Sequence, residues 1–319
     1  MVSFVSTLRF ERETLVVMRG LLVRCSLAAA FVCASLATGA AAFAADCPEG
    51  GTVRFGVEPY EASARLTPVY ESLSKLLAAK IGCPVDVFIT PSYNAEIEAM
   101  RNGKLDVAEF GPLGYVFAHE LAGADVFATY DDANGNPSTY TASIVTWKGS
   151  GLSTLKDVVG RSFAYSDPAS TSGHLFPAYA LRKNGIDPDA AVKPVYAGSH
   201  TSSFEAIRNH KVDAGELNSQ EIDAATQVGE YAAGDYLTLW RSAPIPNDPV
   251  AIRRTLPAPL KKRIVDAFMT LDFSQLPPDL VKVLPAKGTT KYISQSDSAY
   301  DQVRDLVKTM NFDQAKLDH

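Results

Sequence analysis

Three consecutive hydroxyl residues followed by glycine form the most chemically suggestive segment of this sequence. Residues 170–173 read Ser-Thr-Ser-Gly, after an expected strand over 162–166 and before an expected helix over 174–183. The first turn of a helix has unpaired N–H groups and a partial positive charge, so an oxyanion there gains donors without needing Lys or Arg. An ordinary N-cap is the simpler interpretation, but a cap needs only one hydroxyl. The run of Ser170, Thr171 and Ser172 therefore favours a bound oxyanion.

A second turn in the same half of the chain offers another candidate donor. Residues 198–200 read Gly-Ser-His, and His200 opens an expected helix. A lone histidine is more often structural than functional. No metalloprotease, serine-hydrolase, P-loop, dinucleotide-binding or CxxC motif occurs, and the other histidines lack metal-like spacing. We therefore expect no catalytic residue, metal ion or cofactor, with an enzyme that uses His200 as a distant base kept as the alternative.

An internal repeat indicates how these turns are positioned. Residues 98–111 (EAMRNGKLDVAEFG) align with residues 205–218 (EAIRNHKVDAGELN), and seven of the fourteen positions are identical. The same alignment places Tyr93 on His200, and it pairs two short β-prone runs upstream. Each copy predicts a strand, a polar turn, a helix, a Gly or His turn and a second strand. The duplicated Glu109 and Glu216 indicate a shared structural role.

Two copies so far apart predict two related α/β lobes rather than a solenoid. Each lobe is expected to hold a mostly parallel sheet flanked by helices, with both candidate turns at carboxyl ends of strands that face one cleft. Turn-rich residues 131–138 and proline-rich residues 240–249 are the expected crossovers, a pair that suits hinge closure. Helical periodicity around 259–270 and 299–310 would return to the first lobe. The expected boundaries are 46–139 with 248–319 for lobe 1, and 140–247 for lobe 2.

The N-terminus predicts export. Arg19 and Arg24 precede an apolar run that closes on Ala-Phe-Ala at 42–44, so we expect a cleaved signal peptide over residues 1–45, with Met18 a candidate start. The run is too short and too interrupted for a membrane anchor. Cys47 and Cys83 remain after cleavage, each just before an expected neighbouring parallel strand, so a disulfide between them is predicted. The chain has a net charge of −6 and no long basic run, which argues against nucleic-acid binding.

Five short stretches occur in one order behind the signal peptide. They are Ser92-Tyr93-Asn94 with Glu98-Ala99-Met100-Arg101 and Gly103-Lys104-Leu105-Asp106; Phe110-Gly111-Pro112; Asp167-Pro168-Ala169-Ser170-Thr171-Ser172-Gly173; Gly198-Ser199-His200; and Pro244-Ile245-Pro246-Asn247-Asp248-Pro249. Through them the chain resembles the periplasmic phosphonate-, phosphite- and phosphate-binding proteins of ABC transporters from residue 52 to about residue 254. The resemblance implies a two-lobed, type II binding protein that closes on its ligand and docks on a membrane permease. A ligand sensor without a transporter is a further alternative.

The resemblance also implies a ligand set. The phosphorus oxyanion is expected on Ser170, Thr171, Ser172 and His200, with Tyr93 and Tyr140 at the cleft. Relatives that bind aminoalkylphosphonates carry a Glu and an Asp facing the ammonium group. Here the Asp is present as Asp248, but the Glu position holds Gln220, and a neutral amide cannot compensate a buried cation. This departure favours phosphite, phosphate or a small alkylphosphonate over aminoethylphosphonate.

Overall fold

The computed structural model describes residues 47–48 and 50–313, and the expected signal peptide lies outside them. Both sheets described below lie in one compact unit, Thr52–His319. The predicted disulfide is confirmed, since Cys47 and Cys83 are disulfide-bonded to each other. Within the described part of the chain, no helix has the length and apolar character to cross a membrane.

The first sheet has six strands in the order β13-β4-β12-β3-β1-β2. Their bounds are Val53–Val57 for β1, Val85–Ile89 for β2, Val107–Glu109 for β3, Ala124–Tyr130 for β4, Val250–Arg253 for β12 and Tyr292–Ser294 for β13. The central strands of this sheet carry Val, Phe and Ala side chains that are fully buried, as expected for a sheet covered on both faces.

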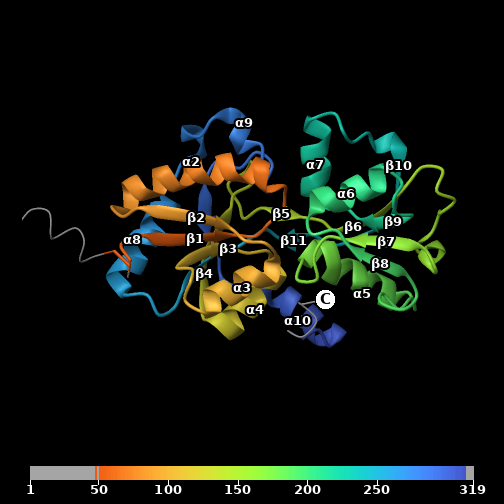
Figure 1. Ribbon diagram of the computed structural model, residues 1–319, viewed down its shortest axis with the longest axis horizontal. Helices are drawn as coiled ribbons and strands as arrows, with labels where there is room; N and C mark the ends of the chain where they lie inside the picture. The colour runs from red at the N-terminus through yellow and green to blue at the C-terminus, as the bar shows by residue number, and fades with distance from the viewer. Residues whose placement is uncertain (1–46, 49, 314–319) are drawn as a thin grey trace, which may run out of the picture. The chain divides into compact units, whose positions relative to one another are not determined.

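Helices cover both faces of this first sheet (Figure 1). One face carries α2 (Ser63–Ile81), α8 (Ala258–Met269) and the short α9 (Pro278–Val281), and the other carries α3 (Tyr93–Arg101), α4 (Pro112–Ala122) and α10 (Asp301–Met310). The helical periodicity expected around 259–270 and 299–310 is thus confirmed as α8 and α10.

The second sheet has five strands in the order β10-β6-β9-β7-β8. Their bounds are Ser143–Trp147 for β6, Ser162–Tyr165 for β7, Lys193–Tyr196 for β8, Ala214–Glu216 for β9 and Tyr236–Arg241 for β10. Helix α5 (Phe176–Lys183) packs on one face through Leu181, and α6 (His200–Arg208) and α7 (Ser219–Gln227) pack on the other through Phe204 and Ala225.

Both sheets are mixed, which corrects the expectation of mostly parallel sheets. β1 pairs in parallel with β2 and β3, and β7 with β8 and β9, but β12 runs antiparallel to β3 and β4, and β6 antiparallel to β9 and β10. The cause lies in the crossovers, where β5 (Thr139–Tyr140) pairs with β11 (Ile245–Pro246) between the two sheets. A strand that follows a crossover starts at the cleft, so it runs opposite to strands that end there.

The repeat predicted from the sequence is present as two matching turns. Ser92 and Ser199 cap α3 and α6 with nearly the same backbone angles (φ −157°, ψ 165° and φ −153°, ψ 165°), and each side chain accepts the N–H three residues on. After each helix, Gly103 and His210 take positive φ values of 64° and 54°. The strands β3 and β9 then end at the edge where the two sheets face each other.

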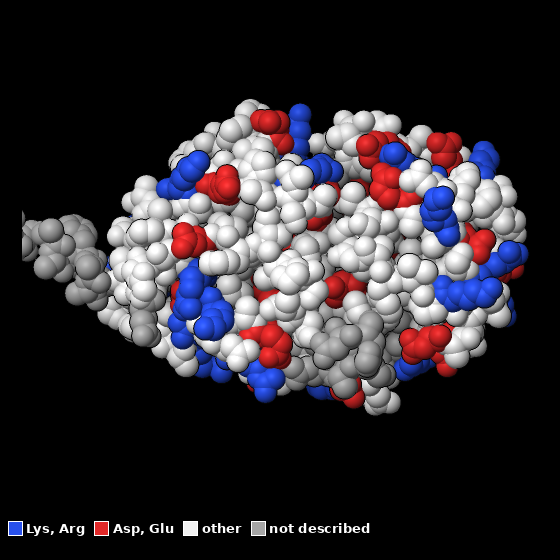
Figure 2. Space-filling view, viewed as in Figure 1, with Lys and Arg blue, Asp and Glu red and all other residues white. Residues whose placement is uncertain are grey.

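Charged side chains are mixed over the surface that Figure 2 presents. Lysine and arginine side chains alternate with aspartate and glutamate on that face, without a continuous basic patch. This distribution agrees with the net charge of −6 and offers no footprint for a polyanion on that face.

Candidate functional site

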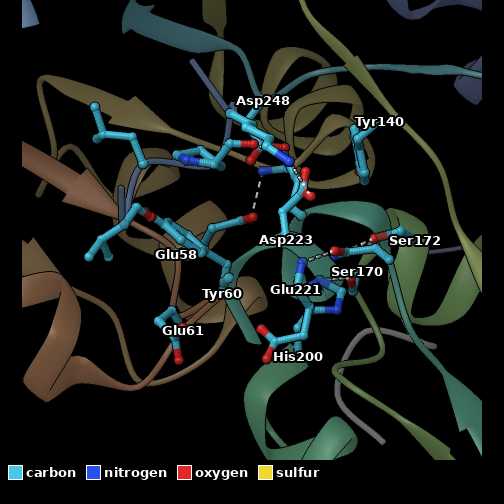
Figure 3. A pocket seen from close by; sticks show the side chains of 18 of the residues that line it. Glu58, Tyr60, Glu61, Tyr140, Ser170, Ser172, His200, Glu221, Asp223 and Asp248 are labelled. Carbon is cyan, nitrogen blue, oxygen red and sulfur yellow. Dashed lines mark hydrogen bonds and ion pairs between the residues drawn. The ribbon is translucent and has the colours of Figure 1, made fainter. Parts of the chain in front are cut away.

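A cavity of about 50 Å³ lies where carboxyl ends of strands from both sheets meet. This is the place where open α/β sheets bind ligands. All eight residues expected to bind the ligand line this pocket: Tyr93, Tyr140, Ser170, Thr171, Ser172, His200, Gln220 and Asp248. Their ligand roles remain predictions, but the structure brings them together at one site from segments far apart in the sequence (Figure 3).

The hydroxyl segment begins a helix, as predicted. Ser170 is the N-cap of a π-helical turn, Thr171–Leu175, that leads into α5, and its Oγ accepts the Gly173 N–H at 3.1 Å. Glycine is required at 173 by close approach, because a Cβ there would lie 1.7 Å from Ser166 Oγ. The three hydroxyl residues are each at most 2% exposed, so their side chains face the protein interior and the cavity rather than bulk water.

Two of these hydroxyls already have partners on other segments. Thr171 Oγ1 accepts the Leu113 N–H at 2.8 Å, which ties the hydroxyl segment to the start of α4 beneath the other sheet. Ser172 Oγ accepts a hydrogen bond at 3.3 Å from Nδ2 of Asn218, which follows β9. The Tyr140 hydroxyl, on the crossover strand β5, interacts with both Ser172 and Thr171. The hydroxyl segment is therefore held in place from three directions.

His200 is paired with a buried carboxylate. Its Nδ1 lies 3.0 and 3.1 Å from the two carboxyl oxygens of Glu216, at the end of β9, and its Nε2 lies 3.4 Å from Ser170 Oγ. Burial lowers the pKa of His200, but the charge and hydrogen bond of Glu216 outweigh burial and leave that pKa raised. We therefore assign the imidazolium form, with Nδ1–H donated to Glu216 and Nε2–H directed at the hydroxyl segment and the cavity.

Tyr93 occupies the position equivalent to His200 in the first turn, and its environment differs. The side chain is 2% exposed, and its hydroxyl has no hydrogen-bond partner among the described residues. Its backbone N–H points to Asp167 Oδ2 at 3.5 Å, on the opposite sheet. A buried, unsatisfied hydroxyl costs roughly 1–3 kcal/mol, so a ligand that accepts from Tyr93 would recover that cost.

Two buried carboxyl groups face the hydroxyl segment across the pocket. Glu58 follows β1, and Asp248 precedes β12; they are 4% and 6% exposed. Burial is the first cause that raises the pKa of both groups, followed by Asp248 for Glu58 and by Glu109 for Asp248. Figure 3 shows Glu58 and Asp248 on one side and Ser170, Ser172 and His200 on the other.

The sequence analysis missed three residues at this site. Glu58 directly follows β1 and Asn218 lies two residues beyond β9, so the rule that ligands lie at carboxyl ends of strands was the available signal. Glu216 was expected to share a structural role with Glu109. Instead, Glu109 accepts hydrogen bonds from the hydroxyls of three tyrosines, whereas Glu216 positions His200.

The mouth of the pocket is closed by contacts between residues on opposite sides. Gln220 Nε2 donates to Asn247 Oδ1 at 2.9 Å and to the Pro285 carbonyl, so its amide is engaged by neighbouring chain rather than free to meet a ligand. The Thr201 hydroxyl contacts Glu61 and lies 3.3 Å from Glu221 Oε2. Burial, and then the charge of Glu61, raise the pKa of Glu221 to about 7.

The arrangement is suited to holding a small anion and offers no centre for a metal ion. In the described part of the chain, no cluster of three or more His, Cys, Asp or Glu side chains has the geometry of a metal site. Donors from the hydroxyl segment and His200 converge on a cavity of about 50 Å³. The site thus fits a compact oxyanion better than an extended molecule.

Comparison with known proteins agrees with a site for a small anion. Residues 55–300 match the family of periplasmic substrate-binding proteins of phosphonate ABC transporters. A phosphonates-binding periplasmic protein of Escherichia coli is 30% identical over 259 residues, which cover 80% of this chain and 75% of that protein. The phosphate-import protein PhnD of Mycolicibacterium smegmatis is 32% identical over 202 residues, covering 60% of this chain and 63% of the relative.

Solved structures confirm the two-lobed, type II fold. A binding protein component of an ABC phosphonate transporter from Pseudomonas aeruginosa superposes with a TM-score of 0.72 at 28% identity, covering 82% of this chain and 86% of that one. PhnD1 of Prochlorococcus marinus, solved with methylphosphonate, has a TM-score of 0.72 at 19% identity and covers 82% of this chain and 98% of its own.

Proposed function

Because this chain belongs to the family of periplasmic substrate-binding proteins of phosphonate ABC transporters, we propose that it captures a small phosphorus oxyanion in the pocket and delivers it to a membrane permease. Members of this family are binding proteins of importers, which sets aside the alternative of an enzyme on the same fold. Family membership implies a periplasmic location, and we infer that a cleaved signal peptide over residues 1–45 directs the chain there.

The observation that carries this proposal is the buried hydroxyl of Tyr93, which has no partner among residues 47–48 and 50–313 and lies opposite a set of anion donors. Ser170, Thr171, Ser172 and His200 supply hydroxyl and imidazolium donors from one sheet, and Tyr93 supplies one from the other. An oxyanion between them accepts from both sides, and hydrogen bonds to a charged acceptor are stronger than those between neutral groups. A ligand that bridges the two sheets also favours closure of the chain around it.

The lining of the pocket narrows the ligand class to small oxyanions. Donors from Ser170, Thr171, Ser172 and His200 converge on one small cavity, which suits phosphite, phosphate or methylphosphonate. Gln220 at the mouth is neutral, which supports the same choice, although its amide already contacts Asn247. The carboxyl groups of Glu58 and Asp248 argue in the opposite direction, because the cationic group of an aminoalkylphosphonate would fit between them and the bound anion.

Closure is proposed to occur by a hinge at the two crossovers. In this proposal, lobe 1 comprises residues 46–139 and 248–319, lobe 2 comprises residues 140–247, and the β5–β11 pair bends between them. The contact between Thr171 and Leu113 and those of Gln220 at the mouth would form on closure. Small-angle scattering is expected to give a smaller radius of gyration with ligand than without it.

Isothermal titration calorimetry with phosphite, phosphate, methylphosphonate, aminoethylphosphonate and sulfate tests the ligand class. We expect the first three to bind more tightly than aminoethylphosphonate and sulfate. Ligand at a hundred times its Kd would also stabilise the fold by about 2.7 kcal/mol in thermal unfolding. Absence of binding by every phosphorus oxyanion, or a clear preference for sulfate, would contradict the proposal.

A further inference from the structure

Glu58 is the part of the pocket that anion binding by itself leaves unexplained. Its side chain is 4% exposed and lines the same cavity as the hydroxyl segment. Oε2 accepts the Gly111 N–H at 2.6 Å, and Oε1 has no hydrogen-bond partner among the described residues. The carboxyl group packs tightly against Gly111, where an added Cβ would lie 3.0 Å from Oε1. One carboxyl oxygen is thus anchored at the start of α4, and the other is available to a ligand.

The groups packed around Glu58 are predominantly carboxyls. Asp248 before β12, Glu96 on α3 and Glu109 on β3 all act to raise its pKa, after burial itself. Glu96 is fully buried, and neither of its carboxyl oxygens has a partner in the described chain. The facing wall carries the cation of His200, and its charge is already paired with Glu216.

Two lysines, Lys282 and Lys287, also line the pocket, and both side chains are exposed to water. Lys287 pairs with Asp223 at 2.8 Å, and its side chain is 68% exposed. A doubly charged oxyanion beside an ionised Glu58 would therefore be repelled in a poorly hydrated cavity, where charges interact more strongly than in water. A proton between them replaces that repulsion with a hydrogen bond.

We propose that Glu58 is a specificity-determining residue that shares one proton with the bound oxyanion, so that capture of the dianion takes up a proton from solvent. In the bound state the proton lies between Glu58 Oε1 and a ligand oxygen, and no bond to phosphorus forms or breaks. This inference rests on the proposed function, because it assumes a phosphorus oxyanion in the pocket. It predicts selection for ligands that can hold such a proton, and affinity that falls as pH rises.

The experiment is calorimetry of phosphite binding at pH 8.5 in buffers of different ionisation enthalpy, which counts the protons taken up. At that pH Glu221, whose pKa is raised to about 7, is ionised whether or not ligand is bound and contributes little. The variant is Glu58→Gln, with Glu71→Gln on the exposed face of α2 as the matched control. The amide of Gln brings its own N–H, so the dianion no longer needs the shared proton.

We expect Glu58→Gln to take up about one proton fewer per phosphite than wild type and Glu71→Gln. Between pH 8 and 9 the affinity of the wild type should fall about tenfold per pH unit, the slope that one linked proton produces. This decline should be absent in Glu58→Gln. Equal proton uptake by wild type and Glu58→Gln, or none by wild type, overturns the inference and leaves the proposed function standing. No binding of phosphite, phosphate or methylphosphonate at any pH contradicts the proposed function instead.

Discussion

The two repeated turns have nearly the same backbone conformation, but they differ in whether their polar side chains have hydrogen-bond partners. The second turn, taken together with the hydroxyl segment beside it, has its partners in place: the imidazolium of His200 is paired with Glu216, and Thr171 and Ser172 accept from Leu113 and Asn218. The first turn, with Tyr93, contains a hydroxyl without a partner among the described residues and lies near the buried carboxyls Glu58 and Glu96. The structure thus has one half that is preorganised for an anion and another half that a ligand completes.

Because of this difference, we expect one turn to set the affinity for anions and the other to set the discrimination between them. Preorganised donors lose little on binding, so the second turn is expected to supply most of the binding energy. Groups that are unsatisfied without ligand respond to which atoms the ligand presents, so the first turn is expected to decide which oxyanion is accepted. Substitutions in the second turn should therefore weaken binding of all anions, and those in the first turn should change their ranking.

The largest expected effect is at the hydroxyl segment. Thr171→Ala removes one donor to the ligand and the contact with the Leu113 N–H, so affinity for phosphite should fall by about a hundredfold. Ser172→Ala should cost about tenfold to a hundredfold. Calorimetric titration measures both, with Thr67→Ala on the exposed side of α2 as control. Wild-type affinity in both pocket variants would mean that the segment is only a helix cap.

The next effect concerns the charge on His200. Glu216→Gln removes the strongest influence that raises the pKa of His200, so burial then lowers this pKa relative to the wild type and the ring holds its proton less strongly. Affinity should fall by about thirtyfold, equivalent to roughly 2 kcal/mol. Since the binding form is the cation, the loss should shrink as pH is lowered from 8 to 5.5. A pH-independent loss would show that Glu216 acts on packing rather than on charge.

A smaller effect, about tenfold, is expected for Tyr93→Phe. The variant removes a hydrogen bond to the charged ligand but also an unsatisfied buried hydroxyl, so the free protein should unfold at the same temperature or higher. Thermal unfolding without ligand and calorimetry with ligand measure the two quantities separately. A drop in stability with unchanged affinity would reverse the interpretation of this turn.

The smallest effect is a change in ligand ranking at the mouth. Gln220→Glu loses the amide donor to Asn247 and Pro285 and adds a carboxylate near Glu58 and Asp248. Phosphite affinity should fall a few-fold, while the affinity ratio of aminoethylphosphonate to phosphite should rise. Titration of both ligands against both proteins gives this ratio. An unchanged ratio would place position 220 outside the ligand's reach and make its role purely one of closure.

Local features of the site were predictable from the sequence because they follow from short-range rules. The caps at Ser92 and Ser199, the helix start at Ser170 and the strands after each helix all depend on neighbouring residues. The resemblance of the motifs then indicated which of these turns share a pocket. The disulfide between Cys47 and Cys83 followed from the expected alignment of neighbouring parallel strands.

The features that escaped prediction depend on contacts between distant segments. The antiparallel strands β6 and β12 follow from where the crossovers enter each sheet, which no local pattern encodes. The partners of Glu109 and Glu216 differ although the surrounding residues are repeated, because tyrosines from other elements surround only the first of them. Glu58 has no motif of its own, and its importance is visible only once α4 and β12 pack beside it.

A crystal structure of the protein with phosphite bound tests the central claim most directly. The account predicts a single anion in the pocket, with its oxygens within hydrogen-bond distance of the hydroxyls at 170–172 and of His200 Nε2, and with the Tyr93 hydroxyl now donating to it. An anion bound elsewhere, or one in the pocket that leaves the Tyr93 hydroxyl without a partner, would contradict the division between a preorganised half and a half that the ligand completes.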